Sequence, residues 1–171
     1  VYKRQMMLDA CGNLRKPEVG FAAAMGDEDA ATEALAVMSS YQEQMLNVLG
    51  ELVKKLGSFK LFPSFRYFNF GSSVGPGFVG EALSLAIESG LIPTDRPVLG
   101  LVRTDKDKIK ISARSTPALA AQGVDVGQAM AKTVAEIGGH GSGHDVAAAG
   151  RIPMQKIDEF LNIFERVLGR K

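Results

Sequence analysis

Two histidines and a cluster of glycines are the residues of this sequence whose types and spacing best suit chemistry. The 171 residues contain no other histidines than these two, and residues 138–150 also hold five glycines. An imidazole can donate a hydrogen bond, accept one or bind a metal ion. Glycine leaves the backbone open to close approach, so that its N–H groups can face an anion. The candidate binding residues of this stretch are Gly138, Gly139, His140, Gly141, Gly143 and His144.

Several interpretations of residues 138–150 compete. A dinucleotide-binding fingerprint would have to follow a strand and open a helix. The order here is the reverse, because helical spacing of apolar residues fills 125–137 and a small, extended segment fills 146–152. A metal site is disfavoured, since the spacing of His140 and His144 joins two ligands only on a helix. Two interpretations stay open: a tight helix-to-strand turn with solvated histidines, and a pocket for a phosphate or nucleotide.

A second candidate site lies on residues 108–114. Apolar and polar residues alternate there, which is typical of a strand with one face in water. At the end of this strand the hydroxyls of Ser112 and Ser115 flank the guanidinium of Arg114, and this grouping suits a phosphate. We therefore expect these three residues to bind phosphate, and we expect the side chains of Arg114 and His144 to face water. The alternative is a charged strand face that is merely solvated.

The other elements must hold these candidates in place. Apolar residues three and four positions apart, with acidic residues before them and Lys54-Lys55 after them, predict one long helix of nearly thirty residues. Pro17 and Gly20 indicate a connector before it. From residue 58 onward short apolar strands alternate with glycine-rich turns and helical patterns, which predicts an α/β fold with a mixed sheet of about five strands flanked by helices. The predicted segments are helices over 1–13, 27–57 and 125–137, helices starting at Pro76 and Pro153, and strands within 59–70, 97–102, 108–114 and 146–152.

Composition limits the class of protein. The net charge is +1 and 46% of the residues are hydrophobic, so the chain lacks the overall basic excess typical of many nucleic-acid-binding domains. Residues 1–57 carry six basic and eight acidic residues, whereas 58–171 carry fourteen and eleven, which concentrates positive charge in the second part. The lone Cys11 excludes an internal disulfide, and no apolar run reaches the ~20 residues of a membrane helix. We expect a cytoplasmic protein with no membrane partner, and the start at Val1 suggests a piece of a longer polypeptide.

Several motifs occur in an order that resembles a known domain. Gly75-Pro76-Gly77-Phe78-Val79-Gly80 is followed by Arg96-Pro97-Val98, then by Ser112-Ala113-Arg114-Ser115, and then by Gly138-Gly139 with His144-x-x-Ala147-Ala148. The ordered set resembles the DHH-associated domain of the RecJ-like phosphoesterases, especially the archaeal branch, and covers about 58–171. A weaker likeness joins residues 8–13 to the end of that family's catalytic domain, with the long helix as the connector. Ser142 and Asn13 depart from the family pattern, which has glycine and arginine there.

The resemblance implies a helical arm, residues 1–57, and a substrate-binding α/β domain, residues 58–171. It implies a parent hydrolase, an exonuclease or phosphodiesterase that acts on single-stranded DNA, RNA or short oligonucleotides with Mn²⁺ or Mg²⁺ on a separate catalytic domain. No catalytic or metal-binding residue is expected in this sequence. Arg114 would clamp a phosphate with Ser112 and Ser115 beside it, and either His144 or His140 would contact the phosphate or sugar.

Two other functions are compatible with the resemblance. Some relatives are catalytically silent scaffolds of the replication complex that bind GINS and the helicase. The same domain also ends alanyl-tRNA synthetases, where it helps to bind tRNA. An Asp-His-His motif upstream in the parent protein would favour the nuclease, its erosion the scaffold, and an aminoacylation domain the synthetase.

Overall fold

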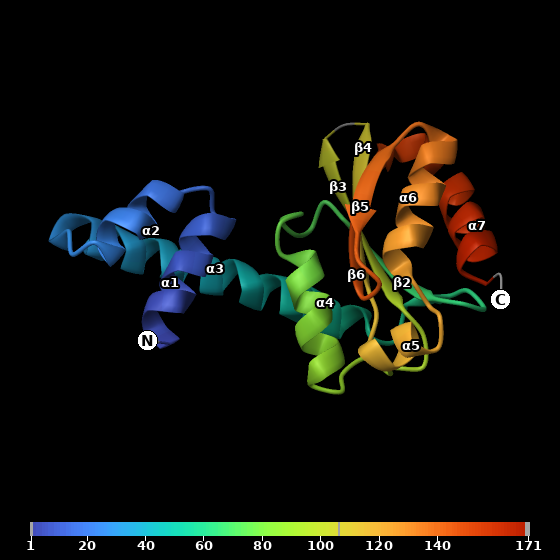
Figure 1. Cartoon of the computed structure of the whole chain (residues 1–171), viewed down its shortest axis with the longest axis horizontal. Helices are drawn as coiled ribbons and strands as arrows, with labels where there is room; N and C mark the ends of the chain where they lie inside the picture. Colours follow the sequence, from blue (N-terminus) through green and yellow to red (C-terminus); the bar gives the residue numbers. More distant parts are fainter. Residues whose placement is uncertain (1, 106, 170–171) are drawn as a thin grey trace. The chain divides into compact units, whose positions relative to one another are not determined.

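The computed structural model describes residues 2–105 and 107–169, and the chain divides into two compact units, Val1–Asn47 and Val48–Lys171 (Figure 1). The first unit is helical and the second contains the sheet. The division falls inside helix α3, Glu28–Lys55. The expected domain boundary between residues 57 and 58 stays a prediction. Of the helices that the structure describes, none has the length and apolar character to cross a membrane.

The long helix is confirmed: α3 has 28 residues. It begins where the Asp27 carboxylate accepts a hydrogen bond from the Ala30 amide at 2.8 Å, and acidic residues fill its first turn. Lys54 and Lys55 occupy its last turn, where cations are stabilised by the helix dipole. Its N-terminal part packs on α1, Tyr2–Asn13, through a small core of Cys11, Ala34 and Val37.

The expected connector at Pro17 and Gly20 is wrong, because these residues belong to a second helix, α2, Pro17–Ala24. Proline suits the first turn of a helix, where its missing N–H costs no hydrogen bond. Gly20 lets α2 approach α1, since a Cβ atom there would lie 2.9 Å from the Cβ atom of Cys11. Both residues therefore serve a helix that packs closely, whereas by sequence they indicated a break.

The second unit contains a six-stranded mixed sheet, which confirms the α/β class with one strand more than expected. The strand order is β1-β2-β3-β4-β6-β5, in which β2 and β3 are parallel and every other neighbouring pair is antiparallel. The strands are β1 Lys60–Leu61, β2 Arg66–Gly71, β3 Val98–Asp105, β4 Lys108–Arg114, β5 His140–Gly143 and β6 Ala147–Pro153. The helices of this unit are α4 Val79–Glu88, α5 Pro117–Ala121, α6 Val126–Ile137 and α7 Ile157–Leu168, with a 3₁₀ turn at Met154–Lys156.

The helices leave the two faces of the sheet unequally covered. Helices α6 and α7 lie on one face, and α4 lies on the other (Figure 1). The main core lies under α6 and α7, where Ile109, Ile111 and Ala113 of β4 meet residues such as Met130 and Phe160. Because successive strand residues point to opposite faces, the alternate residues of β4 point toward the α4 side. There α4 lies mainly against β3 and β4, so β6 and β5 are less covered.

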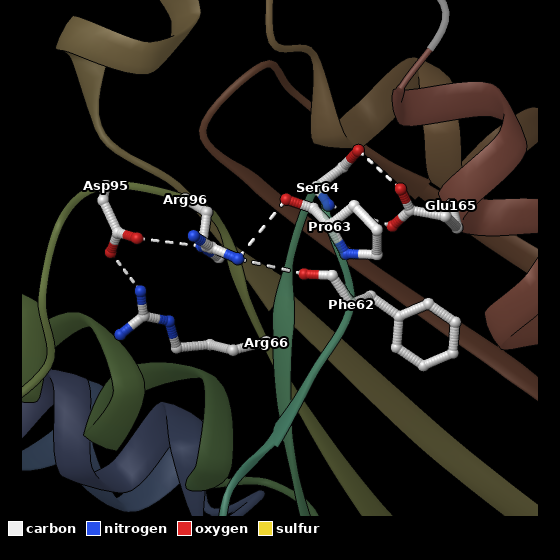
Figure 2. Close-up of polar contacts among 7 residues, drawn as sticks. All are labelled: Phe62, Pro63, Ser64, Arg66, Asp95, Arg96 and Glu165. Atoms are coloured by element: carbon white, nitrogen blue, oxygen red, sulfur yellow. Dashed lines mark hydrogen bonds and ion pairs between the residues drawn. The ribbon is translucent and has the colours of Figure 1, made fainter.

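A polar network fixes the segment before β2 to the segment before β3 (Figure 2). Arg66, 3% exposed, pairs with the carboxylate of Asp95, which also accepts a hydrogen bond from Arg96 at 2.8 Å. Arg96 donates in turn to the carbonyl oxygens of Phe62 and Pro63 at 3.1 and 3.3 Å. Burial opposes ionisation of Asp95, yet the hydrogen bond from Arg96 and the charge of Arg66 outweigh it and hold the pKa of that carboxyl below its usual value.

The same segment is tied to α7. Glu165 accepts hydrogen bonds from the hydroxyl of Ser64 at 2.7 Å and from its backbone amide at 3.1 Å (Figure 2). The start of β2 is thus anchored both to the loop before β3 and to the C-terminal helix.

Candidate phosphate-binding face

The α4 side of the sheet collects basic side chains from three strands. Strand register pairs Lys110 of β4 with Arg151 of β6, and Arg151 with His140 of β5. Residues directly opposite in antiparallel strands point to the same face, so these three side chains form one row across the sheet. A second row starts at Arg114, which pairs with Ala147. We call the surface formed by Lys110, Arg114, Arg151, His140 and Ser142 the basic face.

The first row borders a hollow of about 500 Å³. Its floor is shallow and open because Ala149 brings only a methyl group to it, while the Cβ position of the adjacent Gly150 faces Met130 on the other side of the sheet. Among the described residues, no acidic side chain lines the hollow. The lining residues are Lys110, His140, Gly141, Ser142, Ala149, Gly150 and Arg151.

Lys110 is a cation in a setting that disfavours its charge. Its ammonium donates to the carbonyl oxygen of Pro76 at 2.8 Å, in the loop before α4. Burial lowers the pKa of Lys110 from its usual value, and the positive charges of Arg151 and Arg114 lower it further. Within the described residues, no hydrogen bond or ion pair involves the Arg151 side chain. The row therefore holds positive charge that a bound anion would neutralise.

Arg114 does not lie in open water as expected, because α4 covers it. Its Nε donates to the hydroxyl of Ser84 at 3.0 Å, and its Nη1 donates to the carbonyl oxygen of Ala113 at 2.8 Å. Burial lowers the pKa of Arg114, and the nearby Glu81 acts in the opposite direction. Arg114 is half-buried at the margin of the basic face, with one side of its guanidinium against the helix.

The two serine hydroxyls expected beside Arg114 are less accessible than the guanidinium. Ser112 points to the same face but is 3% exposed between β3 and β6. Ser115 follows the end of β4, and its buried hydroxyl has no hydrogen-bond partner among the described residues. Its backbone amide donates to the carbonyl oxygen of Val146 at 2.8 Å. Because both hydroxyls are buried, we expect Ser112 and Ser115 to shape the end of β4 around Arg114 and not to contact a phosphate directly.

The glycine-rich stretch is a strand where a loop was expected. Gly138 ends α6 with a φ of 76°, and the amide of Gly139 donates to the carbonyl oxygen of Val134 at 2.8 Å. The next four residues form β5, in which Gly141 and Gly143 pair with residues of β6. The backbone of β5 pairs with β6 along one edge, and its other edge has no neighbouring strand among the described residues. The phosphate-binding character of this stretch therefore rests on its side chains and its outer edge.

His140 is the first residue of β5, and His144 directly follows the last. His140 lies in the row of Lys110 and Arg151. His144 closes the hairpin between β5 and β6, where its backbone amide donates to the carbonyl oxygen of Ala147 at 2.8 Å. Ala147 is the partner of Arg114 in the β4–β6 register. Both histidines are exposed. The turn after His144 is fixed by α6, because the amide of Val126 donates to the carbonyl oxygen of Asp145 at 3.1 Å. The fold thus brings each histidine into line with one of the cations of β4.

Two residues of the site, Arg151 and Lys110, were not predicted from the sequence. Arg151 lies two positions beyond Ala149 in β6, on the same face and inside the predicted strand segment 146–152, but the sequence does not show which strands lie beside that segment. Alternation alone places Lys110 beside Arg114, which is the signal that was present in the sequence. The pairing of Lys110 with Arg151 could not be predicted, because periodicity within each segment does not show that β4 and β6 are neighbours.

The described residues contain no group of three or more histidine, cysteine, aspartate or glutamate side chains placed to hold a metal ion. His140 begins β5 and His144 follows its last residue, so the two imidazoles are separated by the length of this strand, and Lys110 and Arg151 lie in the row of His140. These surroundings repel a cation and do not fit a metal site.

Comparison with known proteins gives the family. The DHHA1 domain family matches residues 70–170. The uncharacterized protein MJ0831 of Methanocaldococcus jannaschii is 27% identical over 166 residues, 96% of this chain but only 34% of that protein, so the chain spans about a third of this relative.

Two solved structures share the fold. RecJ of Thermus thermophilus, determined in complex with Mg²⁺, aligns with a TM-score of 0.68 and 18% identity over 97% of this chain and 25% of its own. The C-Ala domain of Aquifex aeolicus alanyl-tRNA synthetase aligns with a TM-score of 0.51 and 16% identity over 66% of this chain and 99% of its own. The matched range contains all the motifs on which the resemblance in the sequence rests, and the chain belongs to the DHHA1 domain family.

Proposed function

We propose that residues 58–171 form the substrate-binding domain of a RecJ-like, single-strand-specific exonuclease or phosphodiesterase. In this proposal the basic face binds the phosphates of single-stranded DNA or RNA. Residues 1–57 join this domain to a catalytic domain elsewhere in the parent protein. That catalytic domain supplies Mn²⁺ or Mg²⁺, which activates water for attack on a phosphodiester.

The observation that carries the proposal is the row of Lys110, Arg151 and His140 on a hollow that no described acidic residue lines. Two neighbouring cations without a carboxylate between them destabilise a fold, because like charges repel, and burial also disfavours the charge of Lys110. A phosphate removes that penalty, since it accepts charge-assisted hydrogen bonds from both. Such an arrangement is therefore expected at a binding site and has no purpose in the packing of the sheet.

Each candidate residue has a role in this proposal. Arg114 holds a phosphate in the second row, with Ser112 and Ser115 shaping the end of its strand. His144 donates to the same phosphate or its sugar, and His140 does so in the first row. Gly138 turns the chain at the end of α6, and Gly139, Gly141 and Gly143 let β5 lie close against β6 and α6, which holds the histidines beside the cations of β4.

Binding of a fluorescent single-stranded oligonucleotide to the 171-residue chain, followed by anisotropy, tests the proposal. Affinity should fall as salt rises, with a log–log slope of about −2 for three neutralised phosphates. Replacing Lys110 and Arg151 together by glutamine should weaken binding by at least about tenfold, because two charge-assisted hydrogen bonds are lost.

Matched controls remove the same charges from the other face of the sheet. Lys132→Gln on α6 and Arg166→Gln on α7 lower the net charge equally, at exposed positions whose partners are Gln128 and Glu136. Equal losses in the control and test variants would show that binding depends on total charge only, and would overturn the proposal. The same holds for binding that is insensitive to salt.

A structured RNA is the second candidate ligand. The reason is that a domain of alanyl-tRNA synthetase has this fold over 99% of its length. Competition of the labelled single strand with an RNA hairpin distinguishes the two. Stronger competition by the hairpin than by an unlabelled single strand would favour the tRNA-binding alternative. The replication-scaffold function, with GINS as partner, stays a prediction.

A further inference from the structure

Helix α4 carries a slot for the guanidinium of Arg114. Gly80 and Ser84 are four residues apart on α4 and therefore lie on the same side of the helix. A Cβ atom on Gly80 would lie 2.4 Å from Nη2 of Arg114 and 3.0 Å from its Cζ. No residue other than glycine fits at this position while the guanidinium stays where it is.

Ser84 orients the guanidinium from the next turn. Its hydroxyl donates its hydrogen to the carbonyl oxygen of Gly80 at 3.2 Å, so that a lone pair is left for the Nε of Arg114 at 3.0 Å. The carbonyl oxygen of Ala113 accepts from Nη1 at 2.8 Å. Of the five N–H groups of an arginine, three have no acceptor among the described residues.

The slot is hard to explain by packing alone. Glycine in the first turn of α4 loses more backbone entropy than alanine would, and burial disfavours the charge of Arg114. An alanine at position 80 and a shorter side chain at 114 would fill the same space without either penalty. The geometry instead fixes one edge of the guanidinium and leaves the remaining N–H groups in a defined direction.

We infer that Gly80 and Ser84 are positioning residues that hold Arg114 in the orientation in which it binds a phosphate on the basic face. This inference rests on the proposed function. Bidentate binding by arginine depends on the orientation of a rigid fork, so a guanidinium that is displaced or free to rotate binds more weakly although its charge is unchanged.

The test compares Gly80→Ala and Ser84→Ala with Arg114→Ala in the 171-residue chain, by oligonucleotide anisotropy and thermal unfolding. The methyl group of Gly80→Ala would meet the end of the flexible Arg114 side chain, so we expect the guanidinium to move aside. Alanine also has a higher helix propensity than glycine, which favours α4. The melting temperature should therefore stay equal or rise while affinity falls by about fivefold to tenfold, the size of one charge-assisted hydrogen bond. A purely structural role would move the two quantities together.

Combined variants and controls complete the design. Adding Gly80→Ala to Arg114→Ala should cause no further loss of affinity, because both act on one contact. Gly50→Ala and Ser39→Ala are the controls. A Cβ atom at Gly50 would meet nothing within 4 Å beyond its own stretch of helix, and Ser39 is an exposed residue of α3. Neither should change affinity.

The affinities of the Arg114 and α4 variants distinguish a wrong positioning role from a wrong phosphate-binding role. If Arg114→Ala weakens binding but Gly80→Ala and Ser84→Ala do not, the positioning role is overturned and the proposed function stands. If Arg114→Ala leaves affinity unchanged, the proposed role of Arg114 is overturned and the inference with it. If both α4 variants lower the melting temperature in step with affinity, the slot is structural and the inference is overturned.

Discussion

The charge of Lys110 lowers the stability of the folded protein. Its ammonium is half-buried, faces Arg151 and Arg114 and finds a single carbonyl oxygen among the described residues, that of Pro76. The lowered pKa expresses the same fact, since the folded protein holds the proton of Lys110 less tightly than the unfolded chain does. Residues selected for packing alone are seldom placed in this way.

Replacement of Lys110 by methionine should therefore separate stability from binding. Methionine keeps much of the volume and removes the repelled charge, so the free energy of unfolding at neutral pH should rise by about 0.5 kcal/mol or stay unchanged. Oligonucleotide affinity should fall by about fivefold to tenfold. Chemical denaturation and anisotropy measure the two effects, and a large loss of stability would assign Lys110 to the support of the loop at Pro76.

The pH dependence of the same variant gives an independent check. Because the folded-state pKa of Lys110 is lowered, the unfolded chain binds more protons between that pKa and the usual value of 10.5. The wild-type free energy of unfolding thus gains a contribution as pH rises through this window. Lys110→Met should lack this contribution, so that the stability difference between the two proteins shrinks toward alkaline pH.

At the scale of elements, the sequence predicted those whose pattern is regular. Strand β4 was predicted to the residue, because strict alternation over 108–114 has no other interpretation. Helix α6 was predicted from residue 125, which caps it. Strand β5 was missed because His140–Gly143 has no hydrophobic alternation and its glycines suggested a turn. Its pairing depends on β6 and α6, which periodicity within the segment cannot show.

The network before β2 is an element whose stability can be tested at one residue. Asp95→Ala leaves Arg66, whose side chain is 4% exposed, buried without a carboxylate. A broken buried pair costs several kcal/mol, but Asp95 is 49% exposed, so water reaches the site and a loss of about 2 kcal/mol is expected. Glu159→Ala, which breaks the exposed pair with Lys156, should cost no more than about 0.5 kcal/mol.

Acid should have the same effect as the Asp95 substitution. A carboxyl whose folded-state pKa is lowered stabilises the fold above its usual pKa, 3.8, and this contribution is lost as pH falls through the lowered value. The stability difference between wild type and Asp95→Ala should therefore narrow below pH 3.8. A difference that is constant with pH would mean that the effect of Asp95 is steric.

At the scale of the whole molecule, this chain has a surface suited to binding and no described cluster of metal ligands. The chain matches the DHHA1 family and spans 34% of its archaeal relative, so binding by this chain and catalysis by another domain are both parts of the proposed function. The family could be inferred from the order of motifs along the sequence. The hollow itself could not, because its walls come from three strands that only the folded sheet brings together.

The purified chain should therefore bind single-stranded oligonucleotides without hydrolysing them. Incubation with Mn²⁺ or Mg²⁺ and an end-labelled strand should release no nucleotides, because the proposed function places the metal ligands on a separate catalytic domain. Release that depends on the metal and is abolished by EDTA would contradict this prediction. The exonuclease RecJ, whose structure is known with bound manganese, is the positive control.

The distance between the two rows of cations sets a minimum length for a ligand that contacts both. Lys110 and Arg114 are four residues apart on one strand, which separates the rows by about 13 Å. One phosphate group is too small to touch both rows, whereas a chain of linked nucleotides can place different phosphates on each. If the basic face binds nucleic acid, affinity should therefore increase in a step with the length of the oligonucleotide, at the length that first spans both rows.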